Sequence, residues 1–160
     1  MNGPSLFRCP LCGSPLTREE RGCICPARHS FDRAAAGYVH LLPPNRMHSK
    51  APGDDREMVA ARAAFLERGY YAPLRQALEE LVLEASAHLE GPVLLDSGCG
   101  EGYYTAGMFR ALERAGHRPR AAGIDISKYA LRRAAKRLPE GEFAVASAYR
   151  LPLADASADL

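Results

Sequence analysis

The chain has 160 residues, of which 47% are hydrophobic and 25% are charged, and its formal net charge is +2. This is the composition of an ordinary globular protein. No run approaches the roughly 18 apolar residues that a membrane-spanning helix needs, and the first residues lack the basic and apolar regions of a signal peptide. We therefore expect a cytoplasmic protein with no membrane partner, built as one medium domain or as one small and one partial domain.

Four of the five cysteines lie in the first 25 residues, which in a cytosolic chain indicates a metal site before a disulfide. Cys9-Pro-Leu-Cys12 precedes Cys25-Pro-Ala-Arg-His29, so two pairs of ligands can face one ion. Three thiolates and one imidazole close a tetrahedral Zn²⁺ site, which leaves no position for water and indicates a structural metal. Cys23, on a predicted strand over 23–25, is an alternative to Cys25 as the third thiolate ligand. We prefer Cys25, because the spacing Cys25-x-x-x-His29 places a histidine ligand beside it.

The charge is unevenly distributed along the chain. Residues 1–50 carry seven Lys and Arg against three acids, a balance of +4, whereas the remainder carries 14 against 16, a balance of −2. A basic surface attracts polyanions, so the zinc segment is the expected nucleic-acid contact. The excess is modest, because three zinc-bound thiolates and one Zn²⁺ lower the balance of residues 1–50 by about one unit. The alternative is therefore a set of solvated basic loops that bind no polyanion.

The segment after the metal ligands divides the chain. Residues 37–42 predict a last strand packed on the zinc hairpin, and two prolines end it. Residues 44–57, rich in Pro, Asn, Ser and His, predict a linker. We therefore predict a zinc-binding, RNA-recognising domain over residues 1–43 and an incomplete second domain over residues 58–160.

Two helices are predicted before the next strand. The first spans 56–68, is capped by Asp54 or Asp55, and carries an apolar stripe. That stripe consists of Met58, Ala61, Phe65 and Leu66. The second spans 73–90 and begins at a proline, which is favoured in the first turn. Between them lies Tyr70-Tyr71, an aromatic pair that either caps the core or closes over a cofactor.

A short apolar strand over 93–96 leads into the loop Asp-Ser-Gly-Cys-Gly-Glu-Gly at 96–102, and a helix over 103–115 follows. Open α/β sheets bind ligands between a strand and a helix, and glycines let the backbone approach the ligand closely. The spacing differs from the dinucleotide fingerprint Gly-x-Gly-x-x-Gly, and the carboxylate of Glu101 repels a pyrophosphate. The loop instead resembles the S-adenosylmethionine loop of class I methyltransferases. The predicted contacts are Asp96, Gly98, Gly100 and Glu101.

A second acid supports this prediction. Asp125 ends a strand over 121–126, where it is placed to accept hydrogen bonds from two ribose hydroxyls. The alternative is an ordinary glycine turn beside a structural aspartate. A helix capped by Ser127 then runs to about Leu138, and its basic residues, Arg137 among them, predict a solvated face.

The last part of the chain predicts an unfinished sheet. Residues 142–148 form a third strand, and 159–160 begin a fourth. A doubly wound sheet has about five or six strands. We therefore expect a truncated chain or a fragment, in which the groups that touch a methyl acceptor are missing.

Five motifs carry a family resemblance. They are Cys-Pro-Leu-Cys, Cys-Pro-x-x-His-x-Phe-Asp, Gly-Tyr-Val-x-Leu-Leu-Pro, Asp-x-Gly-Cys-Gly-Glu-Gly-Tyr-Tyr-Thr and Val-Ala-Ser-x-x-Arg-Leu-Pro. From Cys9 to Asp159 the chain resembles the bacterial 23S ribosomal RNA (guanine-N1)-methyltransferases, some of which confer resistance to macrolides such as tylosin. The resemblance matches Tyr71, Gly100 and Glu101 to cofactor contacts. It matches Cys9, Cys12, Cys25 and His29 to zinc ligands.

The resemblance implies an α/β fold: a small zinc-ribbon-like domain that helps to bind an rRNA hairpin, followed by a class I, Rossmann-like methyltransferase domain that is truncated after its third strand. The implied reaction is S-adenosylmethionine-dependent methylation of N1 of a guanine, and a homodimer is a candidate assembly. One alternative is a zinc-containing methyltransferase of a small molecule or protein. The other is a noncatalytic zinc-ribbon binding module with a degenerate nucleotide fold.

Overall fold

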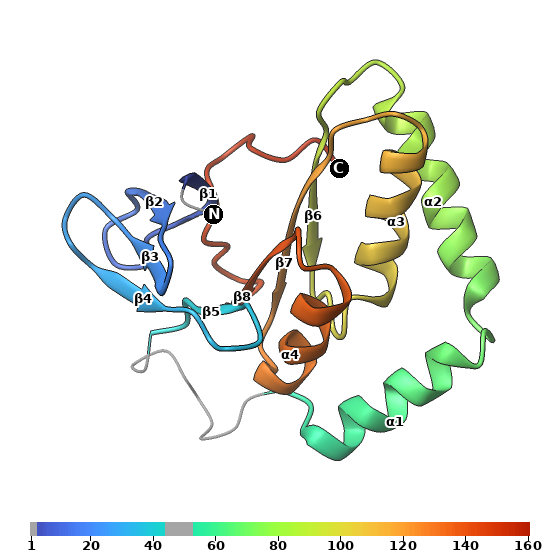
Figure 1. Cartoon of the computed structure of the whole chain (residues 1–160), viewed down its shortest axis with the longest axis horizontal. Helices are drawn as coiled ribbons and strands as arrows, with labels where there is room; N and C mark the ends of the chain where they lie inside the picture. The colour runs from blue at the N-terminus through green and yellow to red at the C-terminus, as the bar shows by residue number, and fades with distance from the viewer. Residues whose placement is uncertain (1–2, 44–52) are drawn as a thin grey trace.

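The computed structural model describes residues 3–43 and 53–160, which form two four-stranded sheets (Figure 1). The first sheet is antiparallel, with the order β1-β2-β3-β4. Its strands are β1 Gly3–Arg8, β2 Pro15–Arg18, β3 Gly22–Ile24 and β4 Ser30–Asp32. A side chain at Gly22 would collide with the carbonyl of Phe31 on β4, so the close pairing of β3 and β4 requires glycine there.

The second sheet is parallel, with the order β5-β8-β7-β6. Its strands are β5 Val39–His40, β6 Val93–Ser97, β7 Arg120–Asp125 and β8 Glu142–Val145. Helix α3 (Tyr103–Arg114) connects β6 to β7, and α4 (Lys128–Arg137) connects β7 to β8. The three predicted strands and two predicted helices of this region are therefore confirmed, although β8 ends before the turn at Ser147.

Helix α1 (Arg56–Glu67) is capped by Asp55, whose Oδ1 accepts from the backbone N–H groups of Glu57 and Met58, each at 2.9 Å. Its predicted apolar stripe is confirmed only at Leu66, because Met58 is 54% exposed and Phe65 is 44% exposed. The buried residues are Val59, Ala63 and Leu66. The helix packs by one edge against α4, so the direction of that contact decides which apolar residues are covered.

Helix α2 (Ala72–Ser86) packs along α3 and ends four residues before the predicted boundary. The hydroxyl of Ser86 donates to the carbonyl oxygen of Val82 at 2.6 Å, and residues 87–91 form turns instead of a further helical turn. Among the described residues, no helix is long and apolar enough to cross a membrane.

Residues 37–42 pack on the zinc-binding half as predicted, since Val39 and Leu41 share a core with Phe7 of β1, but their strand pairs with the other sheet. Strand β5 pairs in parallel with β8, with Val39 opposite Ala144 and His40 opposite Val145. An isolated antiparallel β-bridge between Arg33 and Val39 links β5 to the zinc-binding half. Strand β8 offers an open edge, and the buried Val39 joins the apolar face of that edge, which explains the choice of partner.

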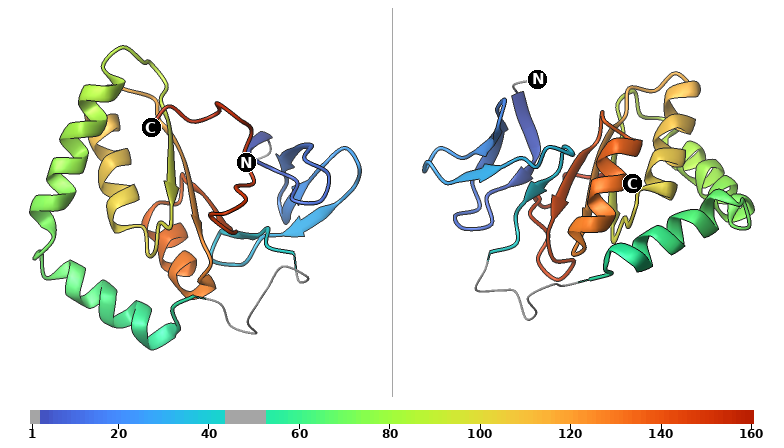
Figure 2. Two further views of the ribbon diagram at one scale, coloured as in Figure 1. Left: turned by 180° about the vertical axis from the view of Figure 1, so that it is seen from behind. Right: turned by 60° about the horizontal axis from the view of Figure 1, so that its bottom comes forward.

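The second sheet buries both faces, but against different elements (Figure 2). Phe143 and Val145 of β8 face α3 and α4, whereas Ala144 of β8 and Ala122 of β7 share a core with Phe7 of β1. The alternation of side chains along a strand produces this division. The zinc-binding sheet therefore covers the face opposite the helices.

A buried carboxylate fastens the two sheets together. Glu142, at the start of β8, is only 8% exposed and accepts from the hydroxyl of Ser5 at 2.6 Å and from the backbone N–H of Leu6 at 3.1 Å. Arg18 of β2 and Arg120 of β7 pair with the same carboxylate at 3.8 and 3.1 Å. In addition, the backbone N–H of Arg8 donates to the carbonyl of Pro152 at 2.7 Å.

The predicted linker over 44–57 lies largely outside the described residues, and Arg56 and Glu57 belong to α1. The division into residues 1–43 and 58–160 stays a prediction. At the other end, residues 159–160 form no assigned strand, but the backbone N–H of Asp159 donates to the carbonyl of Val93 on β6 at 2.9 Å.

Candidate metal centre and cofactor cleft

Two turns of the antiparallel sheet bring together the four predicted metal ligands. Cys9 and Cys12 lie in the turn after β1, and Cys25 and His29 lie between β3 and β4. Their ligand atoms all lie within 4.8 Å of one another. The Nδ1 atom of His29 is 3.4 Å from Sγ of Cys9 and 3.5 Å from Sγ of Cys25, and the sulfur atoms of Cys12 and Cys25 are 3.7 Å apart.

These distances fit a tetrahedral zinc ion. With Zn–S bonds of about 2.3 Å and Zn–N bonds of about 2.0 Å, neighbouring ligand atoms are roughly 3.5–3.8 Å apart. All four positions are taken by protein atoms, so the site is of the closed, structural kind. The thiol of Cys23, the competing ligand, is outside this group and packs in the core beside Phe7 and Val39. Burial raises its pKa, which favours the neutral thiol over a metal-binding thiolate.

The glycine loop leaves β6 in a sharp turn. The backbone N–H groups of Gly98 and Cys99 both donate to the carbonyl of Ile124 on β7, at 2.8 and 2.9 Å. Gly98, Gly100 and Gly102 have φ angles of 88°, 55° and 79°, a region that side chains disfavour. A Cβ at Gly102 would lie 3.0 Å from Cα of Ala134, so this glycine lets α4 approach the loop.

The other two glycines make room for a ligand. A Cβ at Gly98 or Gly100 would have no protein atom within 4 Å, so the backbone there faces open space. Gly98 borders three hollows, of about 840, 200 and 270 Å³. An exposed loop of this shape at the end of a parallel strand is the cradle that a nucleoside cofactor needs.

Two of the predicted acidic contacts are held by the protein. The hydroxyl of Thr105 donates to Oδ2 of Asp96 at 2.5 Å, and burial raises the pKa of that carboxyl. Asp125 accepts from the backbone N–H of Gly100 at 2.9 Å and from that of Ser127 at 2.7 Å. Each carboxylate oxygen keeps a second lone pair, so Asp125 remains able to bind ribose hydroxyls while it fixes the loop.

Glu101 is more enclosed than its position in a glycine loop predicts. It is 2% exposed, and its Oε2 accepts from Nη2 of Arg137 at 2.6 Å. Its Oε1 is buried without a hydrogen-bond partner. Burial raises the pKa of Glu101, and the Arg137 guanidinium opposes that rise. Glu101 borders the 200 and 270 Å³ hollows, on the two sides of the loop.

Tyr71 lies at the start of α2 and is half-exposed. Its ring packs edge-on against Phe65 of α1, with ring centroids 5.6 Å apart. It borders the 270 Å³ hollow together with Gly100 and Glu101, so the structure brings this aromatic residue to the glycine loop.

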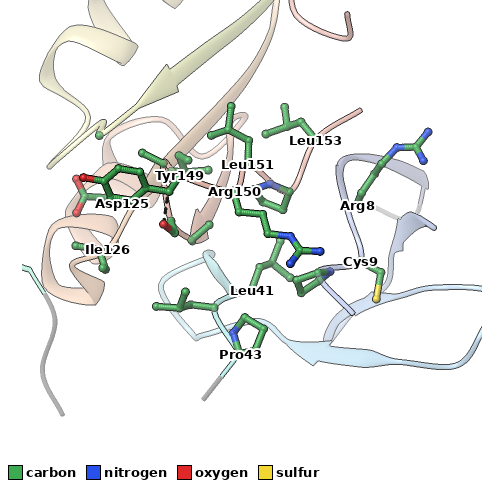
Figure 3. A pocket seen from close by; sticks show the side chains of 18 of the residues that line it. Arg8, Cys9, Leu41, Pro43, Asp125, Ile126, Tyr149, Arg150, Leu151 and Leu153 are labelled. Carbon is green, nitrogen blue, oxygen red and sulfur yellow. Dashed lines mark hydrogen bonds between the residues drawn. The ribbon is translucent and has the colours of Figure 1, made fainter. Parts of the chain in front are cut away.

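The largest hollow extends from the glycine loop to the metal site (Figure 3). Gly98, Asp125 and Ile126 line one end, and Arg8 and Cys9 line the other. Its remaining walls come from two segments, 41–43 and 146–153. Figure 3 shows the Arg150 side chain between Asp125 at one end and Arg8 and Cys9 at the other.

The sequence did not identify three of these features. Arg137 was assigned to a solvated face, whereas its guanidinium contacts Glu101. The sequence predicts a strand over 142–148, a turn over 150–153 and a strand over 37–42, and it does not indicate that these segments wall a cavity. The sequence contains one indication of the cavity wall: the proline in Arg150-Leu-Pro-Leu predicts a bend after β8.

The fold and the two sites define a protein class: a zinc ribbon joined to a class I methyltransferase domain of α/β type. Residues 7–50 match the family model of the RlmA N-terminal zinc ribbon, and residues 95–160 match that of a methyltransferase domain. The methyltransferase domain implies S-adenosylmethionine as cofactor, and the zinc ribbon with its four-ligand cluster indicates Zn²⁺.

The chain is also similar to individual curated proteins. The chain is 39% identical over 170 residues to a putative 23S rRNA (guanine-N1)-methyltransferase of Micromonospora griseorubida, covering 94% of this chain and 55% of the relative. It is 39% identical over 153 residues to the 23S rRNA (guanine(748)-N1)-methyltransferase of Streptomyces fradiae, covering 95% and 52%. A putative 23S rRNA (guanine-N1)-methyltransferase of Bacillus subtilis is 34% identical over 159 residues, covering 98% of this chain and 55% of the relative.

These comparisons confirm the resemblance to the 23S rRNA (guanine-N1)-methyltransferases. The chain is related to them over nearly its whole length, and it spans about half the length of the curated relatives it matches.

Proposed function

We propose that this protein transfers a methyl group from S-adenosylmethionine to N1 of a guanine in a 23S rRNA hairpin. The observation that carries the proposal is the cavity of about 840 Å³ that is lined at one end by the cofactor loop and at the other by the zinc ribbon. RNA that contacts the ribbon is thereby next to the cofactor. The proposed substrate, 23S rRNA, and the proposed methylated atom, guanine N1, are taken from the names of the relatives.

Each predicted cofactor residue has a distinct role in this proposal. The backbone at Gly98 and Gly100 lies against the cofactor, because no side chain separates the two. Asp125 accepts the ribose hydroxyls, Tyr71 closes over one side, and Glu101 offers its unpartnered oxygen. Asp96 orients the start of α3 through Thr105.

The cofactor supplies a methyl group on a sulfonium, which is transferred by in-line displacement. The N1 lone pair forms the new bond to carbon as the carbon–sulfur bond breaks, and the N1 proton is lost to solvent or to a nearby base. Positioning of the donor and the acceptor supplies most of the acceleration in such a reaction. Holding the loop rigid through Asp125 is therefore part of the catalytic task.

The zinc ribbon is proposed to select the RNA. Arg8, Arg28 and Arg33 of the ribbon have no carboxylate partner among residues 3–43 and 53–160, and neither has Arg150 in the cavity wall. Unpaired guanidinium groups bind phosphates well. An unpaired loop base is easier to present to the cofactor than a paired one, since extrusion costs a few kcal/mol.

The test is methyl transfer to protein-free 23S rRNA lacking the modification. Methylation at N1 blocks the Watson–Crick edge, so reverse transcription should stop one nucleotide before the modified guanine. Methyl incorporation without such a stop would place the methyl group on another atom. Cofactor binding without any RNA methylation, combined with transfer to a small molecule or protein, would instead support the alternative methyltransferase. A protein that binds RNA but no cofactor would support the noncatalytic module.

The proposal has three finer parts. They are macrolide resistance, a cytoplasmic location and a homodimer. Resistance predicts that expression in a susceptible bacterium raises the inhibitory concentration of tylosin, and that Asp125→Ala abolishes the rise. An equal rise with both forms would contradict it.

A further inference from the structure

Arg137 stands at a point where three elements meet around the cofactor loop. It is the last residue of α4, and its Nη2 lies 2.6 Å from Oε2 of Glu101 in the loop and 3.4 Å from Oε1 of Glu67 on α1. Its guanidinium carbon lies 5.8 Å from the centre of the Tyr103 ring on α3. A guanidinium fixed by a ring and two carboxylates has little freedom to rotate.

Glu101, the carboxylate that pairs with this guanidinium, has one oxygen without a hydrogen bond. Glu101 is 2% exposed, one of its oxygens is taken by Arg137, and the other is buried with no hydrogen-bond donor among the described residues. Nε of Arg137 is also buried without an acceptor, so the ion pair leaves one donor and one acceptor unused. Of these two residues, Glu101 borders the 200 and 270 Å³ hollows and Arg137 does not, so the unused oxygen is the group that a cofactor N–H or cationic group can meet.

We propose that Arg137 is a positioning residue of the cofactor site, which keeps Glu101 ionised and directs its second oxygen to S-adenosylmethionine. Arg137 does not touch the cofactor in this scheme. It acts through Glu101, and it joins α1 to the same point through Glu67. The inference rests on the proposed function and adds to it the group that holds the acidic loop residue in place.

The charge balance around Glu101 makes the pH dependence predictable. The surrounding charged and titratable groups are Asp54 before α1, Arg62 and Glu67 of α1, Tyr71 at the start of α2, Tyr103 and Tyr104 of α3, Asp125 of β7, and Arg133 and Arg137 of α4. Burial raises the pKa of Glu101, while Arg137 is the strongest group that lowers it. Loss of Arg137 therefore raises the pKa further, so that Glu101 takes up its proton at a higher pH.

The experiment is calorimetric titration of the purified protein with S-adenosylmethionine across the range from acid to neutral pH. Arg137→Gln should bind about tenfold more weakly at neutral pH, the ratio for one lost charge-assisted contact. Its affinity should also fall further as the pH is lowered, beginning at a higher pH than in the parent. Arg137→Lys keeps the charge and should restore most of the parent's pH profile.

Three control variants separate positioning from general damage. Arg133→Gln removes a neighbouring charge of α4 that lowers the pKa of Glu101 less than Arg137 does and makes no hydrogen bond to it, so it should change the affinity and the pH profile much less than Arg137→Gln. Glu101→Gln should bind weakly but with no pH dependence from this site. The double variant Glu101→Gln with Arg137→Gln should bind no more weakly than Glu101→Gln alone, because both changes remove the same contact.

The outcomes distinguish this inference from the function on which it rests. If Arg137→Gln keeps the parent's affinity and pH profile while Asp125→Ala weakens binding, the inference is overturned and the proposed function stands. If Arg137→Gln and Arg133→Gln weaken binding equally, a general charge effect replaces the positioning role. A parent protein that binds no S-adenosylmethionine would overturn the proposed function and this inference together.

Discussion

The metal centre and the cofactor cleft differ in where their binding groups point. The zinc ligands converge on one another, with four atoms inside 4.8 Å, so no coordination position is left for water or substrate. The cofactor cleft is bordered by backbone that faces open space at Gly98 and Gly100, and its acids are already held by protein donors. The first site therefore contributes to folding, whereas the second keeps its binding capacity for a ligand.

The difference between the two sites indicates how the zinc ribbon and the parallel sheet together form one binding cavity. The ribbon packs on the sheet face that the helices leave open, and it forms one end of the cavity whose other end is the cofactor loop. A small domain whose own core is limited gains stability from both the metal and the sheet. The comparison yields four predictions, from the largest expected effect to the smallest.

The largest effect is expected from removing two of the metal ligands. In Cys9→Ser with Cys12→Ser, we expect loss of the bound zinc and unfolding of the ribbon, because structural zinc contributes on the order of 10 kcal/mol to such domains. Elemental analysis of freshly purified protein measures the loss. Cys23→Ser is the matched control and should keep its zinc, since Cys23 lies outside the cluster. Full zinc retention in the double variant would refute the ligand assignment.

The attachment between ribbon and sheet should depend on Glu142. In Glu142→Ala, the hydroxyl of Ser5 and the backbone N–H of Leu6 lose their acceptor, so we expect a loss of about 2–3 kcal/mol in the free energy of unfolding. Urea denaturation measures this. Glu79→Ala is the control, because Glu79 pairs with Arg75 and Arg114 without touching the ribbon. An effect of Glu142→Ala no larger than that of the control would mean that apolar packing alone joins the halves.

The ribose assignment is tested by Asp125→Ala. Loss of a two-bond acceptor should weaken S-adenosylmethionine binding by about 1–3 kcal/mol. Because Asp125 also accepts from the backbone of Gly100 and Ser127, we expect a fall of about 1 kcal/mol in stability as well. Calorimetry and thermal denaturation measure the two effects, with the exposed Asp155→Ala as control. Unchanged cofactor affinity would remove Asp125 from the ribose site.

The smallest effect is expected from the ribbon's exposed arginines. Neutralising Arg28 and Arg33 to Gln should weaken rRNA-hairpin binding and flatten its salt dependence by up to about two phosphate contacts, while cofactor affinity stays unchanged. Binding measured at several salt concentrations gives the slope. Arg132→Gln with Lys136→Gln removes the same charge from the exposed face of α4 and serves as control. Equal slopes for parent and variant would assign RNA recognition to another surface.

Patterns within a short stretch of chain were predicted well. The four zinc ligands lie in two turns of one small sheet, and their spacing alone limits how they meet. The glycine loop joins adjacent elements, so its place between β6 and α3 follows from neighbouring residues. The caps Asp55 and Ser127 are likewise local, because each accepts from a backbone N–H within three residues.

Contacts between distant segments were not predictable in this way. Arg137 meets Glu101 across 36 residues, and Glu142 meets Ser5 across 137. A basic residue on an amphipathic helix and an acid at the start of a strand have no sequence signal that names their partners.

By itself, the sequence determined the cysteine and histidine cluster, the glycine loop, the place of Asp125 at a strand end and the order of strands and helices over residues 93–145, because each depends on spacing along the chain. Only the tertiary structure decided that β5 joins the second sheet, that the ribbon covers its free face and that α1 turns Met58 and Phe65 outward. The physical reason is that hydrophobic burial has no direction of its own: apolar residues at 39–42 and on α1 are satisfied by any open face, and the faces left open by the rest of the fold determine which one they cover.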